Sequence, residues 1–199
     1  MDLIKSASDR DRALDILEKA FLASPGMTWM IKPGRSDRFR MLLRHCYEEA
    51  KAYRGHYLTK DRSGVVFFYN LKNKRGSLRL FFRQLTTTLF VTGVRRGIQA
   101  SEVRRMVDKI RPKSGWCAWL LASDEKPGNG ATNEIRREIF ELADQTSEPI
   151  YVETTRKRMR LVYERIGFKE YHKVKHPYEE TYIWFLKRDP FTGYKSKRS

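Results

Sequence analysis

The chain has 199 residues, of which 40% are hydrophobic and 13% aromatic, a composition typical of one folded domain rather than of a disordered chain. Lys and Arg outnumber Asp and Glu by 41 to 24, and the net charge of +17 favours anionic partners such as nucleic acid, membrane surfaces or phosphorylated cofactors. The longest apolar stretches, Val65–Tyr69 and Tyr182–Leu186, are too short to span a bilayer, and Cys46 and Cys117 alone make neither a disulfide framework nor a zinc site.

The periodicity of apolar residues divides the first half of the chain into helices and a pair of strands. In chain order the expected elements are a helix capped by Ser8-Asp9 and ended by Pro25-Gly26, a helix from Ser36 to Gly55, strands at His56–Lys60 and Gly64–Leu71, a helix over Ser77–Val91, and a short helix from Ser101 to Ile110. A short turn separates the two strands, which therefore predict a β-hairpin.

The second half of the chain alternates strands and helices. The expected elements are a strand at Trp116–Ala122, a loop at Ser123–Thr132, a helix at Asn133–Ala143, a strand at Pro149–Glu153, a helix at Arg156–Ile166 closed by Gly167, and strands at Phe168–Val174 and Thr181–Lys187. The strand–helix–strand order predicts a right-handed parallel crossover, and the hairpins add antiparallel strands. We therefore expect one α/β (α+β) domain over residues 1–187 and a basic, flexible tail over residues 188–199.

The loop before the helix at Asn133–Ala143 is rich in small residues and reads Pro-Gly-Asn-Gly-Ala-Thr at positions 127–132. Such a loop exposes backbone N–H groups at a helix N-terminus, where the helix dipole favours a phosphate. Gly128 and Gly130 permit a positive φ and close approach by a ligand. The loop has neither the Gly-Lys-Ser/Thr of a Walker loop nor the glycine spacing of a Rossmann fold. From composition alone, an ordinary turn is an equally good interpretation.

A second segment favours the phosphate site. Pro149–Thr155 is followed by Leu-Val-Tyr-Glu-Arg-Ile-Gly-Phe at positions 161–168. Together with the glycine-containing loop, this segment resembles the GNAT superfamily of acyl-CoA-dependent N-acyltransferases. In that family a strand leads to a Gln/Arg-Gly-x-Gly-x-Gly/Ala loop and a helix, and a second strand leads to a helix that ends Leu-Tyr-Glu-x-x-Gly-Phe. The resemblance covers about Trp116–Lys187 and implies a mixed, mostly antiparallel sheet of about six to seven strands flanked by helices.

Three features depart from the family pattern. Pro127 stands where Gln or Arg is usual, and proline has no N–H to donate. Thr132 stands where Gly or Ala is usual, and Arg156–Arg160 lacks the Asn that often precedes the Tyr-Glu-x-x-Gly-Phe segment. A catalytically silent member that binds coenzyme A without turnover is therefore an open alternative.

The resemblance implies acetyl-CoA as co-substrate and no metal. The pyrophosphate would lie on the N–H groups of the glycine-containing loop, and the pantetheine arm would run beside the preceding strand. A strand N–H near Ala122 would polarise the thioester carbonyl. The implied cofactor-binding residues are Leu121, Ala122, Ser123, Gly128, Asn129, Gly130, Ala131, Thr132 and Arg156.

Two catalytic residues and one acceptor-side residue are expected. The resemblance places Tyr163 where the family's tyrosine protonates the departing thiolate, whereas the residue alone also fits a packing aromatic at a helix end. Glu153 is one candidate for the general base, with a solvated or salt-bridged strand carboxylate and a water chain as the alternatives. Trp29 lies in an apolar loop that would help to wall the acceptor site, or else is buried in the core.

The function expected from these features is transfer of an acetyl group from acetyl-CoA to a primary amine of a small molecule or a protein, by direct attack. The rival from another class is a nucleic-acid-binding protein on the same fold, but the sequence has no base-reading motif and its charge is spread along the chain, so only weak binding is expected. The N-terminus lacks the apolar core of a signal peptide, so we expect a cytoplasmic protein with no membrane association. The oligomeric state that we expect is a monomer or a homodimer.

Overall fold

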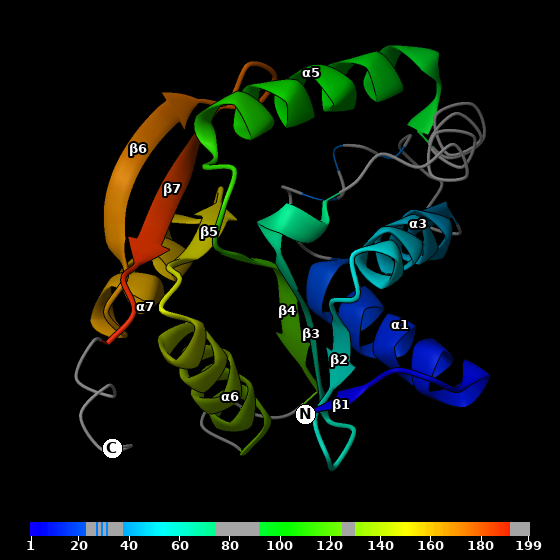
Figure 1. The fold of residues 1–199 in the computed structure, drawn as a ribbon. Helices are drawn as coiled ribbons and strands as arrows, with labels where there is room; N and C mark the ends of the chain where they lie inside the picture. The colour runs from blue at the N-terminus through cyan, green and yellow to red at the C-terminus, as the bar shows by residue number, and fades with distance from the viewer. Residues whose placement is uncertain are drawn as a thin grey trace.

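A computed structural model of the chain describes residues 1–22, 27, 29, 31, 38–74, 92–124 and 130–191 (Figure 1). The helices within these residues are α1 (Ala7–Phe21), α3 (Phe39–Ala52), α5 (Val94–Ile110), α6 (Gly130–Thr146) and α7 (Lys157–Arg165), with a short 3-10 helix at Leu71–Asn73. The strands are β1 (Asp2–Leu3), β2 (His56–Leu58), β3 (Gly64–Asn70), β4 (Trp116–Ser123), β5 (Ile150–Thr154), β6 (Lys169–Lys175) and β7 (Tyr182–Arg188).

The strands form one seven-stranded sheet in the order β1-β2-β3-β4-β5-β7-β6. Among the described strands, β4 and β5 are the parallel pair, and every other neighbouring pair is antiparallel. The expected mixed, mostly antiparallel sheet is therefore confirmed, and so is the parallel crossover through α6. Within the described residues, no helix has the length and apolar character needed to cross a membrane.

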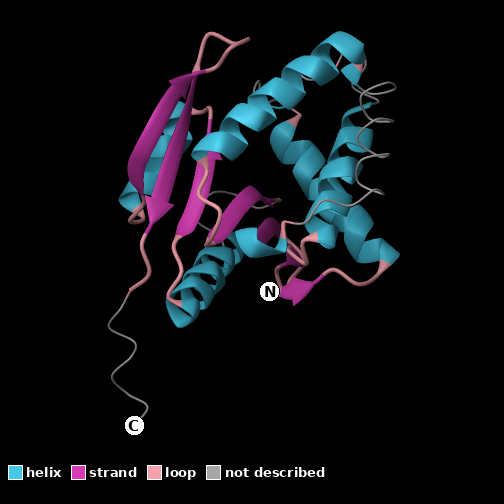
Figure 2. Cartoon of the chain, turned by 45° about the horizontal axis from the view of Figure 1, so that its top comes forward, coloured by secondary structure: helices cyan, strands magenta, loops and turns pink. Residues whose placement is uncertain are grey.

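Helices cover both faces of this sheet (Figure 2). The alternation of side chains along β3 sends Val65 and Phe67 toward α1 and α3, and Val66 and Phe68 toward α6. All four side chains are fully shielded from solvent. Burial of each contributes roughly 1.5–3 kcal/mol, so β3 is the centre of both cores.

Element boundaries differ from the expected ones where polar residues decide them. Ser6 rather than Ser8 caps α1, because its Oγ accepts a hydrogen bond from the Asp9 N–H at 3.0 Å. Ser101 is not a cap: it lies inside α5, and its Oγ donates to the Gly97 carbonyl at 2.9 Å. α6 begins at Gly130, inside the segment expected to be a loop.

Three expectations about local structure fall on residues outside the described ranges. These are the helix over Ser77–Val91, the helix stop at Pro25-Gly26, and the tail beyond residue 191. The two-residue strand β1, by contrast, is described and was not expected. It is too short for a periodicity to reveal it, and it pairs with Tyr57 and Leu58 of β2.

The two parallel strands separate soon after they meet. β4 and β5 pair at Trp116 with Ile150 and at Cys117 with Tyr151, and no further pairs follow although β4 continues to Ser123. On its other edge β4 stays paired with β3, with one extra residue at Trp119 that forms a bulge. The sheet is therefore open between β4 and β5, and the open edge begins next to the bulge.

Candidate functional site

The open edge of β4 presents unpaired backbone groups toward β5. The Asp124 N–H donates to the Ser63 carbonyl at 2.8 Å, so the backbone N–H of residue 124 points toward the β3 side. Because N–H groups alternate along a strand, those of Leu121 and Ser123 face the open side and that of Ala122 faces β3. The backbone N–H expected near Ala122 to polarise the thioester carbonyl would therefore belong to Leu121 or Ser123. The Ala122 side chain lies in the core with α1 and α3.

The N-terminus of α6 lies beside the end of β4. The Thr132 and Ser123 Oγ atoms are 3.4 Å apart, which joins the two elements. Ala131 is buried, whereas Gly130 is exposed, and a Cβ added to Gly130 would meet no atom of the described residues within 4 Å. Gly130 is the first residue of α6, and its missing side chain leaves open space among the described residues at the helix terminus.

The surroundings of this helix N-terminus are polar and partly basic. The first turn contains no acidic residue, so the helix dipole is not compensated there. A shallow hollow next to Gly130 is lined by Lys60, Asn133, Arg136 and Arg137, together with Asp61 and Glu134. The expected contacts Gly128 and Asn129 lie outside the described residues. Gly130, Ala131 and Thr132 thus lie together with Ser123, as an anion site at this terminus requires.

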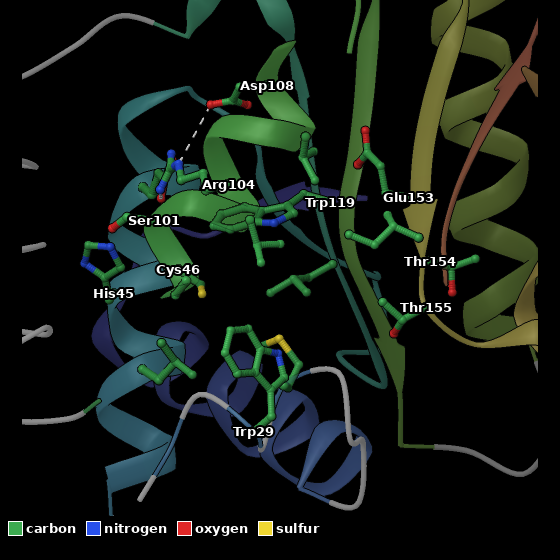
Figure 3. Close-up of a pocket in the computed structure, with 18 of the residues that line it drawn as sticks. Trp29, His45, Cys46, Ser101, Arg104, Asp108, Trp119, Glu153, Thr154 and Thr155 are labelled. Carbon is green, nitrogen blue, oxygen red and sulfur yellow. Dashed lines mark hydrogen bonds and ion pairs between the residues drawn. The ribbon is translucent and has the colours of Figure 1, made fainter. Parts of the chain in front are cut away.

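A cavity of about 370 Å³ lies on the opposite side of the open sheet (Figure 3). α3 and α5 form two of its walls, and the third is formed by β4 and β5 with Trp119, Glu153, Thr154 and Thr155. In the close-up Trp29 lies at one end and Asp108 at the other. The cavity is therefore aromatic at one end and charged at the other.

The charged end is a network of ion pairs contributed by three separate elements. Arg111, which follows α5, holds Glu153 of β5 with two hydrogen bonds, Nε to Oε1 at 2.6 Å and Nη2 to Oε2 at 2.8 Å. Arg104 of α5 holds Glu49 of α3 in the same two-pronged way. Glu49, Arg111 and Glu153 expose only 5%, 8% and 11% of their side chains. Because these side chains are so little exposed, loss of one member of a pair would leave the charge of the other member buried and uncompensated.

The aromatic end joins two segments that are distant in sequence. Trp29 meets the ring of His176 edge-on at 5.3 Å and stacks on Tyr178 at 6.3 Å between centroids. The backbone N–H of Tyr178 donates to His176 Nδ1 at 3.2 Å, so the neutral imidazole carries its proton on Nε2. Burial lowers the pKa of His176, which favours that neutral form. Trp29 thus lines the cavity, and its neighbour His176 presents a donor rather than a base.

The two expected catalytic residues lie on opposite faces of the sheet. Glu153 points into the cavity, where Arg111 already engages both of its oxygens. Tyr163 lies on α7, on the α6 side, and packs against Phe168 with ring centroids 5.4 Å apart. Burial, with a smaller effect from the Glu153 charge, raises the pKa of Tyr163 to about 12. Its hydroxyl is therefore protonated at neutral pH, as a proton donor must be.

Sequence patterns missed most of the charged end of the cavity. Glu49, Arg104 and Arg111 were not singled out, because no local motif distinguishes them from other charged residues. Arg156 was expected at the phosphates. It is the N-cap residue just before α7, its side chain is exposed and lines the cavity, and its backbone N–H donates to Thr154 Oγ1. Within the described residues, no cluster of three or more His, Cys, Asp or Glu side chains is placed to hold a metal ion.

No family model matches the sequence, and no curated protein sequence matches it either. Solved structures are similar over nearly the whole chain. A histone acetyltransferase HPA2 and related acetyltransferase from Corynebacterium glutamicum superposes with a TM-score of 0.64 at 19% identity, covering 94% of both chains. Arylalkylamine N-acetyltransferase 2 from Aedes aegypti gives 0.61 at 13% identity, covering 94% of this chain and 97% of the other. An N-acetyltransferase from Staphylococcus aureus gives 0.53 at 12% identity, covering 90% and 96%.

These similarities define the class of fold. The seven-stranded sheet with its single described parallel pair, open between β4 and β5, is the fold of the GNAT acetyltransferases. The chain has this fold over nearly its full length, including the N-terminal half, where the sequence carries no family motif. The resemblance inferred from two short segments is confirmed at the level of the fold.

Proposed function

We propose that this protein transfers an acetyl group from acetyl-CoA to the primary amine of a small acceptor. The observation that carries the proposal is the open edge between β4 and β5, with a helix N-terminus whose first turn has no acidic residue at one side and a cavity at the other. An extended pantetheine arm fits an unpaired strand edge, because its amides can pair with the strand like an added strand. Phosphates fit the open space before Gly130 and the N–H groups of the first turn of α6.

The residues present support a division of labour between the two faces. Acetyl-CoA supplies the activated acyl group as a thioester. The N–H groups of Leu121 and Ser123 are positioned to donate to a carbonyl oxygen at the open edge. On the α7 face, protonated Tyr163 is the proton donor for the sulfur as the C–S bond breaks, and the proton that the new amide nitrogen loses restores the tyrosine through solvent. On the cavity face, Glu153 of β5 lines the cavity and receives the proton of the acceptor's ammonium, directly or through water.

The cavity supports a compact acceptor with an apolar or aromatic body. Trp29, Trp119 and Tyr69 contribute rings to its lining, and aromatic rings stabilise both flat apolar groups and cations. The carboxylates of Glu49 and Glu153 each form an ion pair with an arginine, so neither offers an unpaired negative charge to a polycation. Similar structures include arylalkylamine N-acetyltransferases, and an alkyl amine that carries an aromatic ring is the acceptor class that this cavity favours.

Acetyl-CoA binding is the first test of this function. A ligand that binds only the native state stabilises it by RT ln(1 + [L]/Kd), about 2.7 kcal/mol at 100 Kd, so acetyl-CoA should raise the midpoint of thermal unfolding by several degrees. Turnover is then measured as release of free CoA in the presence of 2-phenylethylamine, spermidine or a lysine-containing peptide. No shift at millimolar acetyl-CoA would remove the cofactor assignment, and a shift without turnover of any amine would leave a silent binding protein.

A salt titration separates the acetyltransferase from the nucleic-acid-binding alternative. Binding of an oligonucleotide weakens with log[salt] in proportion to the phosphates neutralised, at roughly −0.9 per phosphate for a duplex. We expect weak duplex binding that disappears near physiological salt, while acetyl-CoA binding persists because backbone N–H groups carry part of it. Fluorescence anisotropy of a short labelled duplex and calorimetry of acetyl-CoA measure both. Nanomolar duplex affinity at about 150 mM salt would reverse the ranking.

A further inference from the structure

α5 belongs to a long connection that the sheet does not require. β3 and β4 are adjacent antiparallel strands, which a two-residue turn can join, yet residues 71–115 separate them. In Figures 1 and 2, α5 crosses over the open side of the sheet, from the end of β6 and β7 toward α3. Long connections in compact domains usually have a function of their own.

Apolar packing contributes little to the position of α5. Gly97 is the buried residue of this helix, while Val94 and Ile98 expose 58% and 55% of their surface. A helix of a globular domain is normally held by an apolar stripe against the core. The apolar residues in the second half of α5, Val103, Met106, Val107 and Ile110, are only partly buried, so other interactions must contribute to its position.

Polar contacts tie α5 to every wall of the cavity. Near its start, Arg96 donates to the carbonyls of Trp29 and Ile31, and Glu102 accepts from the hydroxyl of Tyr178. Toward its end, Arg104, Asp108 and Arg111 follow one another at helical spacing on one face. They meet Glu49 of α3, Lys74 after β3, and Glu153 of β5, respectively.

The two arginine pairs are the strongest of these ties. Each is two-pronged and charge-assisted, and each reaches a carboxylate that is almost completely buried. Removal of one partner from such a pair leaves an uncompensated buried charge. Val103, Arg104 and Val107 of α5 line the same cavity as Cys46 of α3, so displacement of α5 opens that cavity to solvent.

We propose that Arg104 and Arg111 are positioning residues that fix α5 as the roof of the cavity, and that the acceptor site is complete only while both pairs are made. The role of the cavity as acceptor site rests on the proposed acetyl transfer, but the roof itself does not. The roof holds the aromatic end through Arg96 and the β5 carboxylate through Arg111, so one helix sets the distance between the two ends of the site.

Thiol labelling tests the roof without any substrate. Cys46 lines the cavity and exposes 6% of its surface, and Cys117 is fully buried in the sheet and provides an internal reference. Mass spectrometry follows the rate at which N-ethylmaleimide modifies each cysteine. We expect Arg104→Met and Arg111→Met to accelerate modification of Cys46 by about tenfold, since a local opening free energy lowered by about 1.4 kcal/mol gives that factor. Arg104→Lys should restore part of the wild-type protection.

Arg105→Met and Lys109→Met are the matched controls. Both residues are exposed on α5 and make no ion pair within the described part of the chain, so each variant removes a charge from the same helix without touching the roof contacts. They should label like the wild type. Equal rates for Arg104→Met, Arg111→Met and the controls would overturn the proposal. Equal acceleration of Cys46 and Cys117 in Arg104→Met would also overturn it, because it would indicate global unfolding.

Kinetics then separates the roof from the cofactor site. With any amine that the wild type acetylates, the Arg104 and Arg111 variants should raise the acceptor KM by about tenfold and leave the Kd of acetyl-CoA unchanged. A raised Kd for acetyl-CoA with an unchanged acceptor KM would assign the arginines to the cofactor and overturn the proposal. If the wild type binds no acetyl-CoA, the proposed function fails, whereas the labelling rates still decide whether Arg104 and Arg111 hold the roof.

Discussion

Replacement of Tyr163 by phenylalanine should lower kcat by about 10²- to 10⁴-fold, the usual loss when a positioned general acid is removed. The sulfur that leaves the acyl group must gain a proton, and the Tyr163 hydroxyl is the donor proposed for it. Its pKa of about 12 keeps it protonated at neutral pH. Phenylalanine retains the ring that packs against Phe168, so the fold and the Kd of acetyl-CoA should change little.

The measurement compares kcat from CoA release with the Kd of acetyl-CoA from calorimetry. Tyr57→Phe is a matched control, because Tyr57 is also a partly buried tyrosine whose pKa is raised by burial, but it lies on β2 and donates to the Arg54 carbonyl. It should retain wild-type kcat. Unchanged turnover in Tyr163→Phe would reduce Tyr163 to a packing residue and leave solvent as the proton source.

The sheet was predictable from sequence because its strands have strong local patterns. Gly64–Leu71 is a run of β-branched and aromatic residues, and the strand observed at Gly64–Asn70 is buried on both faces. Likewise Gly167 has a φ of 98°, which glycine adopts readily, and it ends α7 where the sequence indicated. In the strand, local conformational preference and tertiary burial require the same residues, whereas at the exposed Gly167 the backbone conformation alone favours glycine.

The start of α5 was not predictable, since its sequence contains no apolar stripe from which to read a helix. Val94-Arg-Arg-Gly-Ile-Gln-Ala places a glycine in the middle and leaves its large apolar side chains in solvent. Ser101 therefore stood out as a cap, although its hydroxyl donates backward within the helix. Helix turns that bury few apolar side chains, such as the first two turns of α5, carry little periodic signal.

The charged end of the cavity was hidden for a related reason. In a chain with 33% charged residues, Glu49, Arg104 and Arg111 have no local feature that distinguishes them. Their pairing depends on a helix, a connection and a strand that meet only in the folded sheet. By contrast, Gly130 and Tyr163 belong to segments whose order along the chain is itself informative, so the resemblance pointed to them directly.

Replacement of Gly130 by valine should weaken acetyl-CoA binding by about 100-fold while leaving the fold intact. Gly130 is the first residue of α6, and a Cβ there would meet no atom within 4 Å in the part of the chain that the structure describes, so we expect room for the new side chain. The same space is the approach to the first-turn N–H groups. Exclusion of a phosphate from one or two of these charge-assisted hydrogen bonds, at roughly 1.5–3 kcal/mol each, corresponds to about that factor.

A graded series makes this prediction sharp. Gly130→Ala should give an intermediate Kd, because one methyl group fills less of the approach than the branched valine. Gly167→Ala is the opposite control: its positive φ strains any side chain, so it should lower the midpoint of thermal unfolding yet leave the Kd of acetyl-CoA near the wild-type value. If Gly130→Val binds acetyl-CoA normally, the phosphates do not lie at this helix terminus. If Gly130→Val unfolds at a much lower temperature than the wild type, the fold itself requires a glycine at this position, and the weaker binding is not caused by exclusion of the phosphate.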